Sequence, residues 1–545
     1  MKKTLLTLSI AAVFAVGASA AEFKAGTYTA KAPGIHGDVT VTVTFTKDKI
    51  TDVKVTHSET PGIGSKAAEL LPGRIVERQS PQVDGVTGAT ITSTAIRTAV
   101  ADTVKQAGAD PAALVPLAVK KQAKNETVDT DVVVVGGGGA GMSATIRTRM
   151  NGLNVVLVEK MPFIGGAASI SGGQVVAQGS KLQKAFGVTD DSVESMVKDF
   201  QANGHNLNDL SKLTLYAKNV GPTIDWLHDQ VGVKFIPNDL PFLAEYSHRR
   251  ALEFQGGAGT MAQHLREVIG SNGAKVLFNT RVEKLIVEDG KVTGVEAVDG
   301  NTGTKYTIRA KKTLLTTGGY GNNKNLLTDT YKNTLYYGPV SSTGDGLRFV
   351  NEKASNRHIL DPMLQQKGGM AYVFMDQKSW EGFYKRLPET GVSHEDADKY
   401  LAANGKSAPI FVKGATLEEA AKLAGINAEN LKATVAKYNS FVKAQKDADF
   451  GRPVQYMKAE IAAQGPYYIV EQKPRFATTM GGVCTDDHLN LIQSNGKVIP
   501  NLYGAGELVG GVMGDDSPAG ANVGWALTSG RVAADAIAEA IKAGK

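Results

Sequence analysis

Alternating hydrophobic and polar residues predict two paired strands near the start of the chain. From residue 39 to 46, valine or phenylalanine alternates with threonine, the period of a strand with one buried face. A polar turn over residues 47–49 follows, and residues 50–57 alternate again, which indicates a hairpin. Residues 65–71 are predicted to form a short helix, and a second helix runs to about Gln106. We therefore expect a small α+β domain over residues 21–108.

An unbroken hydrophobic run begins a larger α/β unit. Val132–Val135 leads into a glycine-rich turn, a helical stretch and a further strand that ends at Glu159. This order is typical of a dinucleotide site, in which Gly136 allows the tight turn, Gly138 lets backbone approach a pyrophosphate, and Gly141 lets helix and strand pack closely. The pyrophosphate would lie at the helix N-terminus, and Glu159 would accept hydrogen bonds from a ribose. The alternative is an ordinary strand–helix loop, and the pattern alone fits NAD as well as FAD.

Composition and charge exclude several classes of function. A chain of 545 residues has room for three or four domains, and 42% hydrophobic with 21% charged residues is ordinary for a globular protein. The formal net charge of +6, without a run of Lys or Arg, gives no support to nucleic-acid binding. The single cysteine, Cys484, excludes an internal disulfide and a Cys-x-x-Cys-His haem attachment. The histidines show no ligand spacing, so no metal site is predicted.

The first twenty residues have the pattern of a secretory signal peptide. Lys2-Lys3 precedes an apolar run from Leu5 to Val16, and Ala18-Ser-Ala20 fits a small-residue cleavage site. The run is too short to span a bilayer as a stable helix. We therefore expect residues 1–20 to be removed and the mature protein to be exported to the periplasm.

The first domain carries a threonine motif after a loop that begins Glu59-Thr-Pro-Gly. Asp84-Gly-Val is followed by Thr87-Gly-Ala-Thr90 directly before the second helix. This stretch resembles the small FMN-binding domain of bacterial respiratory flavoproteins. The resemblance implies covalent FMN, attached to Thr90 through a phosphoester by a flavin transferase. The alternative is a threonine-rich turn that caps the following helix.

Glycine motifs along the rest of the chain resemble the fumarate reductase/succinate dehydrogenase flavoprotein superfamily. They include Gly165-Gly166, Thr317-Gly-Gly319, Thr343-Gly-Asp345-Gly, Arg348-Phe-Val-Asn-Glu352, Thr479-Met-Gly-Gly482 and Gly504-Ala-Gly-Glu507. The resemblance implies an α/β fold: a Rossmann-like FAD-binding domain with an inserted α+β capping domain, preceded by the small α+β FMN-binding domain. The expected order is a linker over residues 109–128, FAD-binding domain over 129–346, capping domain over 347–463, and FAD-binding domain again over 464–545.

The same resemblance implies that FAD is bound without a covalent bond. The residues expected to hold it come from the glycine turn, the strand end and the later motifs: Gly136, Gly138, Gly141, Glu159, Lys160, Gly166, Gly172, Gly173, Gly319, Asp345, Glu507 and Asn522.

The superfamily also implies a reaction, the reduction of a carbon–carbon double bond conjugated to a carboxylate. Hydride comes from reduced FAD, and an arginine on the capping domain protonates the neighbouring carbon. The nearest match for that arginine is Arg357, one residue beyond the family position, and the alternative is an ordinary surface arginine.

Three departures from the superfamily concern the substrate. A family histidine is replaced by Thr478, and a family arginine in the last glycine-rich loop is replaced by Ser517. A second carboxylate would then remain unpaired, which is costly in a partly desolvated site, so we expect fumarate to be a poor substrate. The segment between Gly346 and Arg348 is also several dozen residues shorter than in the family. Arg357, Thr478 and Ser517 are the catalytic candidates.

Together these features predict an exported reductase of an acrylate-, urocanate- or cinnamate-like acid in anaerobic respiration. Electrons would pass from FMN to FAD and then to the unsaturated carboxylate. Because the chain has no haem motif, the resemblance implies a separate cytochrome or membrane quinol dehydrogenase as electron donor. Two alternatives are a dehydrogenase similar to the ketosteroid dehydrogenases of the superfamily and a flavin electron-transfer protein that has lost catalysis.

Overall fold

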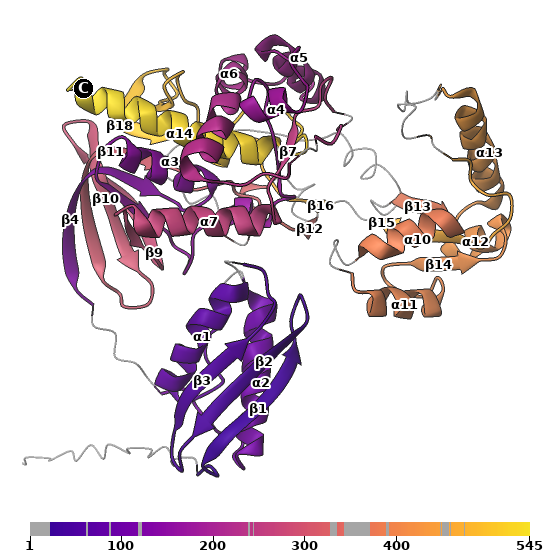
Figure 1. Cartoon of the computed structure of the whole chain (residues 1–545), viewed down its shortest axis with the longest axis horizontal. Helices are drawn as coiled ribbons and strands as arrows, with labels where there is room; N and C mark the ends of the chain where they lie inside the picture. The colour runs from indigo at the N-terminus through magenta and orange to yellow at the C-terminus, as the bar shows by residue number, and fades with distance from the viewer. Residues whose placement is uncertain are drawn as a thin grey trace, which may run out of the picture.

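Three units make up the described part of the chain (Figure 1). The computed structural model describes residues 22–61, 64–86, 89–117, 123–237, 240–243, 245–327, 335–339, 341–342, 371–387, 392–446, 448, 457, 459–472 and 475–544. A small N-terminal unit lies beneath a large central unit, and a third unit stands at the side of the central one. We call them the FMN unit, the FAD unit and the cap.

The FMN unit contains the predicted hairpin within an antiparallel three-stranded sheet. Its strands, in spatial order, are β1 (Gly26–Pro33), β2 (Asp38–Phe45) and β3 (Ile50–Thr56). Val39, Val41 and Val43 are fully buried against the helices α1 (Gly64–Arg78) and α2 (Thr90–Gln106). Strand β1 was not predicted because most of its side chains are exposed or half-buried, which weakens the alternation. Helix α1 continues beyond the predicted end at residue 71, through Pro72.

The predicted linker over residues 109–128 is wrong at both ends. Leu114 is buried in the core of the FMN unit, and the Leu117 N–H donates to the Arg78 carbonyl over 2.9 Å. At the other end, β4 begins at Asn125, where its ladder with β11 starts. The sequence does not reveal these contacts, because they join the segments to residues that are distant along the chain.

The FAD unit is built on an eight-stranded sheet. Five of its strands are parallel, in the order β18-β11-β4-β5-β8, and antiparallel strands extend it beside β11 and β18. The strands are β4 (Asn125–Val135), β5 (Val155–Val158), β8 (Lys275–Leu277), β9 (Thr280–Glu288), β10 (Lys291–Asp299), β11 (Lys305–Leu315), β17 (Asn490–Ile492) and β18 (Val498–Gly504). The four consecutive valines at the end of β4, Val132–Val135, are at most 5% exposed, as expected for a central parallel strand.

Helices and short strand pairs complete the FAD unit. Helix α3 follows β4 and packs against α14 and α7. The helices are α3 (Gly139–Met150), α4 (Lys181–Ala185), α5 (Val193–Asn203), α6 (Leu210–Trp226), α7 (Gly257–Ser271) and α14 (Ala521–Lys542). The paired short strands are β6 (Gln174–Val176) with β7 (Ala251–Glu253), and β12 (Leu335–Tyr336) with β16 (Arg475–Phe476). The chain thus has the predicted α/β class with a Rossmann-like unit.

The cap is a small α+β unit whose sheet extends beyond the predicted boundary at residue 463. Its antiparallel strands are β13 (Ala371–Asp376), β15 (Tyr467–Gln472) and β14 (Phe411–Gly414), with β15 in the centre. Its helices are α10 (Gln377–Arg386), α11 (His394–Ala403), α12 (Leu417–Ala424) and α13 (Ala428–Ala444). Residues 467–472 therefore belong to the cap and not to the returning FAD-binding segment.

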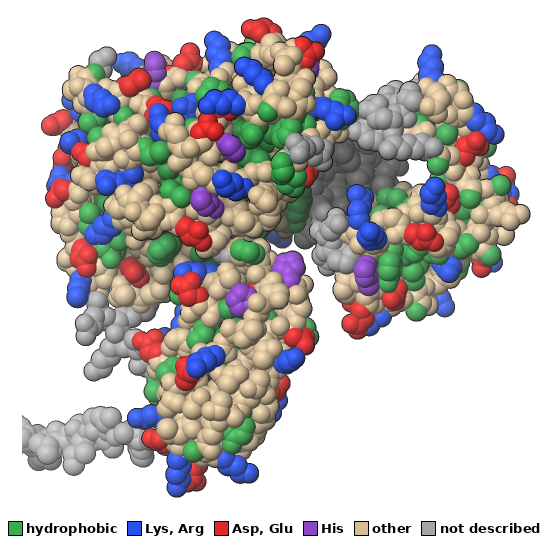
Figure 2. Space-filling view, in the orientation of Figure 1, with side chains coloured by type: hydrophobic (Ala, Val, Ile, Leu, Met, Phe, Trp, Pro, Cys, Tyr) green, Lys and Arg blue, Asp and Glu red, His purple; other side chains and the backbone are tan. Residues whose placement is uncertain are grey.

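The visible surface carries Lys or Arg and Asp or Glu side chains interspersed over all three units (Figure 2). Among the described residues, no helix has the length and apolar character needed to cross a membrane.

The central place of β15 in the cap sheet predicts where a core substitution acts. Ile469 is fully buried and pairs with Phe374 on one side and Val412 on the other. We expect Ile469→Ala to lower the stability of the cap by about 2–5 kcal/mol, because it leaves a cavity in the sheet core. Hydrogen exchange followed by mass spectrometry should show faster exchange over residues 371–472. Val373→Ala, on the exposed side of the neighbouring strand, is the control and should change exchange little; faster exchange in β18 and α14 instead would contradict the assignment.

Candidate functional site

The turn between β4 and α3 has the geometry that the sequence predicts for a dinucleotide site. Gly136 has a φ of +103°, and a Cβ on it would lie 2.5 Å from the Thr316 carbonyl oxygen. A Cβ on Gly141 would lie 1.9 Å from the Gly136 carbonyl oxygen, so helix and turn pack with no room for a side chain. A Cβ on Gly138 would meet nothing within 4 Å, which leaves its surface free for a ligand. The three glycines thus have three different local surroundings.

Glu159 lies at the end of β5 and holds the turn from the side. One carboxylate oxygen accepts the Gly137 N–H and the other accepts the Met161 N–H, each over 2.7 Å. Burial raises the pKa of this carboxyl, while the hydrogen bonds and Lys160 act in the opposite direction. This carboxylate already fixes two backbone segments. Its remaining lone pairs could accept the expected hydrogen bonds from a ribose.

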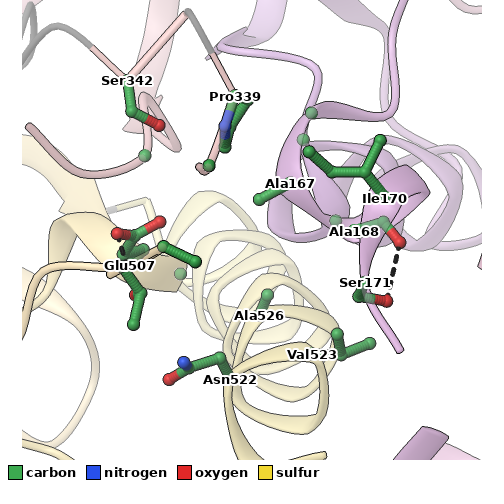
Figure 3. Close-up of a pocket in the computed structure, with 18 of the residues that line it drawn as sticks. Ala167, Ala168, Ile170, Ser171, Pro339, Ser342, Glu507, Asn522, Val523 and Ala526 are labelled. Carbon is green, nitrogen blue, oxygen red and sulfur yellow. Dashed lines mark hydrogen bonds between the residues drawn. The ribbon is translucent and has the colours of Figure 1, made fainter. Parts of the chain in front are cut away.

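A cavity of about 940 Å³ runs from this turn to the cap. Its size falls within the range of cofactor sites. Eight of the predicted cofactor residues line it: Gly136, Gly138, Glu159, Lys160, Gly166, Gly172, Glu507 and Asn522. Figure 3 shows Glu507 opposite Ser342 and Pro339, with Ala167 and Ile170 across from the first turns of α14. The cap contributes Tyr372, Val373 and Gln472.

Three other predicted cofactor residues support the walls rather than line the cavity. Gly141 packs in the turn, and a Cβ on Gly173 would lie 3.3 Å from the start of α7. A Cβ on Gly319 would lie 2.2 Å from a carboxylate oxygen of Glu507. Asp345 and Arg357 lie outside the described residues. Several lining residues stand in no glycine motif and were not predicted from the sequence, among them Thr280, Arg281, Pro339 and Ser342.

Glu507 is a buried carboxyl group of the cavity that accepts several hydrogen bonds. Its Oε1 accepts the Thr478 hydroxyl and the Thr479 N–H, both over 2.9 Å, and the Thr479 hydroxyl over 3.1 Å. Burial raises the pKa of Glu507, and these donors partly offset that effect. Because the Thr478 hydroxyl proton is committed to Glu507, Thr478 can offer a substrate only an acceptor.

The loop that carries Ser517 is held by contacts from outside the cavity. His205 Nδ1 lies 2.7 Å from the Asp515 carboxylate, and the Tyr246 hydroxyl donates to the Ala519 carbonyl over 2.8 Å. Within the cavity, the Ser517 hydroxyl accepts a hydrogen bond from the Asn522 amide. The loop ends at the N-terminus of α14, a helix of 22 residues whose free N–H groups and dipole favour negative charge.

At the predicted FMN site, Thr90 is exposed and is the first residue of α2. The residue that caps α2 is Ala89, which makes no side-chain capping bond, so the capping alternative has no support at this position. Glu59 is buried nearby, and its carboxylate accepts the Ile35 N–H, the His36 N–H and the Thr92 hydroxyl. Burial acts to raise the pKa of Glu59, but these hydrogen bonds outweigh it and the pKa is lowered.

Comparison with known proteins agrees with both units. The FAD binding domain family matches residues 131–356 and 342–523, and the FMN-binding domain family matches residues 34–105. Urocanate reductase of Eggerthella lenta is 30% identical over 95% of this chain and 93% of its own length. NADH:acrylate oxidoreductase of Vibrio harveyi is 27% identical over 95% of this chain and 62% of its own length.

A solved structure agrees with the overall fold of most of the chain. The open conformation of a flavocytochrome c3 fumarate reductase superposes with a TM-score of 0.58 at 29% identity, over 76% of this chain and 78% of that one. The fold and the glycine-lined cavity thus define an FAD-binding oxidoreductase with an additional FMN-binding domain. The chain belongs to the FAD-binding flavoprotein family of the fumarate and urocanate reductases, flavin oxidoreductases that act on carbon–carbon double bonds.

The different surroundings of two glycines give a test of the cofactor site. We expect Gly141→Ala to destabilise the apoprotein strongly, because its Cβ would collide with backbone, and to abolish FAD binding. Gly138→Ala has open space, so we expect an unchanged apoprotein Tm but FAD affinity reduced by about tenfold or more. Thermal unfolding and flavin fluorescence measure both effects. Equal FAD affinity in Gly138→Ala and the parent protein would exclude pyrophosphate from this turn.

Proposed function

We propose that this protein reduces an α,β-unsaturated monocarboxylate, with electrons passing from FMN to FAD and then to the substrate. The observation that carries the proposal is the continuous cavity that joins the glycine turn to the cap among the described residues. Such a cavity can hold FAD along its length and a small acid at its cap end. Its relatives by sequence include reductases named for urocanate and acrylate, both monocarboxylates.

The charges along the cavity favour one carboxylate over two. Among the described lining residues, the cations are Lys160 and Arg281, and both lie beside Glu159. Lys160 follows Glu159 in sequence, and Arg281 follows Thr280, whose N–H donates to the Glu159 carbonyl. The opposite end has Ser517, Thr478 and the acidic Asp516. Among the described residues at that end a second carboxylate would meet no cation, and burying a charge without a partner is costly.

The chemistry divides between the cofactor and the side chains. Bound FAD supplies hydride to the double bond. The α14 N-terminus offers N–H groups and a favourable potential to the substrate carboxylate. Tyr372 and Gln472 of the cap form the opposite wall, and Arg357 is proposed as the proton donor to the adjacent carbon, on the strength of the family resemblance.

The FMN unit would supply the electrons. Thr90 is exposed at the start of α2, where a flavin transferase could reach its hydroxyl and form the phosphoester. The electron donor is proposed to be a cytochrome or a membrane quinol dehydrogenase in anaerobic respiration, and the pattern of residues 2–20 supports a periplasmic site.

The function is tested by anaerobic oxidation of reduced viologen. Reduction of one double bond takes two electrons, from two viologen molecules, and two protons. With both flavins bound, we expect acrylate, urocanate or cinnamate to oxidise viologen at least tenfold faster than fumarate, because the described residues at the cap end include no cation that could pair with a second carboxylate. Stopped-flow or steady-state measurement of the viologen absorbance gives the rate.

Two arginine variants sharpen this assay. Arg357→Ala should lose at least a hundredfold in rate while both flavins remain bound, because the proton donor is gone. Arg386→Ala, an exposed arginine in α10 of the cap, is the matched control and should keep the parent rate. If no acid oxidises viologen although both flavins are present, the protein is an electron-transfer flavoprotein or acts on another substrate class, such as a steroid.

The covalent flavin is tested by mass. After expression with a flavin transferase, the parent protein should carry the added mass of one FMN, and Thr90→Ala should not. Thr94→Ala, exposed one turn further along α2, should be modified like the parent. Intact-protein mass spectrometry and flavin fluorescence in a denaturing gel measure both. An FMN adduct that persists in Thr90→Ala would move the attachment elsewhere.

A further inference from the structure

The loop between β5 and the short helix Gly166–Ile170 places one side chain in the hydrophobic core of another unit. Phe163 is 8% exposed and is a member of the buried hydrophobic cluster of the FMN unit. Every other buried member of that cluster lies between residues 23 and 114. Phe163 is therefore an aromatic group of the FAD unit that is covered by the FMN unit.

The next residue, Ile164, faces the other way. It is 2% exposed and belongs to the core of the FAD unit, where its Cγ2 lies 2.2 Å from the position that a Cβ on Gly137 would take. Backbone bonds fix the loop beneath it: the Gly165 N–H donates to the Gly137 carbonyl over 2.7 Å, and Arg266 Nη1 donates to the Ile164 carbonyl over 2.6 Å. The loop is thus anchored on the dinucleotide turn while Phe163 points into the FMN unit.

A second contact lies between the loop before α1 and helix α7. A Cβ on Gly259 of α7 would lie 3.5 Å from both the Thr60 Cγ2 and the Pro61 carbonyl oxygen. In Figures 1 and 2 this end of the FMN unit abuts the FAD unit beneath α7. The start of α7 in turn lies against Gly173, next to Gly172 in the cavity wall.

The same end of the FMN unit carries Thr90. A Cβ on Gly64 at the start of α1 would lie 2.8 Å from the Thr92 hydroxyl, so α1 and α2 begin side by side. The end that would bear the FMN therefore faces the FAD unit rather than solvent on the far side.

We propose that Phe163 is the docking residue that holds the FMN unit against the FAD unit for electron transfer between the two flavins. The role of this docking in electron transfer rests on the proposed function. Two electrons leave the reduced flavin of one unit and reduce the flavin of the other, so one is oxidised as the other is reduced, and protons exchange with water. Because electron tunnelling slows steeply with distance, a unit that undocks should transfer slowly. Burial of one large aromatic side chain is a typical way to fix such a contact.

Docking can be measured without any flavin. Thr60→Cys and Gly259→Cys introduce a pair at the second contact, in a Cys484→Ser background because Cys484 is exposed. The Thr60 Cγ2 lies 3.5 Å from the position of a Cβ on Gly259, so the two cysteine side chains would be neighbours and we expect a disulfide under mild oxidation. Phe163→Ala should slow its formation at least tenfold. Phe242→Ala, a phenylalanine that is 39% exposed, is the matched control and should leave the rate unchanged. An unchanged rate with Phe163→Ala would overturn the docking role.

The consequence for electron transfer is measured with a double-variant cycle. The rate of viologen turnover should be at least tenfold lower in Phe163→Ala than in the parent protein, and Phe163→Leu should recover part of it. The double variant Phe163→Ala, Thr90→Ala should turn over no more slowly than Thr90→Ala alone. A further loss in the double variant would mean that Phe163 supports the FAD unit itself, which overturns the role in transfer. If Thr90→Ala leaves turnover unchanged, the proposed electron route fails, and the disulfide rates still decide whether Phe163 docks the unit.

Discussion

The carboxylate of Glu159 is the contact on which the geometry of the cofactor region depends. Its two oxygens accept the Gly137 and Met161 N–H groups, and its own backbone carbonyl accepts the Thr280 N–H. One residue thereby ties the dinucleotide turn, the loop after β5 and the start of β9. A buried carboxylate is costly unless hydrogen bonds compensate it, and here the backbone supplies them.

The segments tied by Glu159 serve different units. Gly137 belongs to the turn that faces the cavity, and the loop after Met161 carries Phe163 and Ile164, which enter the FMN unit and the FAD core respectively. The position of the FMN unit is thus mechanically linked to the wall of the FAD cavity.

Different groups line the far end of the cavity. There Glu507 is held by the hydroxyls of Thr478 and Thr479, and the Ser517 hydroxyl accepts from Asn522. Thr478, Ser517, the acidic Asp516 and the N-terminus of α14 line this end, and the described lining residues there include no cation. This wall supports the proposed preference for a substrate with one carboxylate, and residues of the cap strands β13 and β15 line the same cavity.

The sequence by itself determined the features that depend on local backbone needs. Gly136, Gly138 and Gly141 could be assigned separate roles because steric limits at a tight turn act on neighbouring residues, and the alternation of β2 and β3 fixed the hairpin. Tertiary structure decided what long-range contacts control. The cap strand β15 lies beyond the predicted boundary because its partners β13 and β14 are distant in sequence, and β4 begins early because β11 pairs with it. Likewise, nothing in the local pattern around Phe163 shows that its side chain is buried by another unit, since burial depends on which surfaces meet after folding.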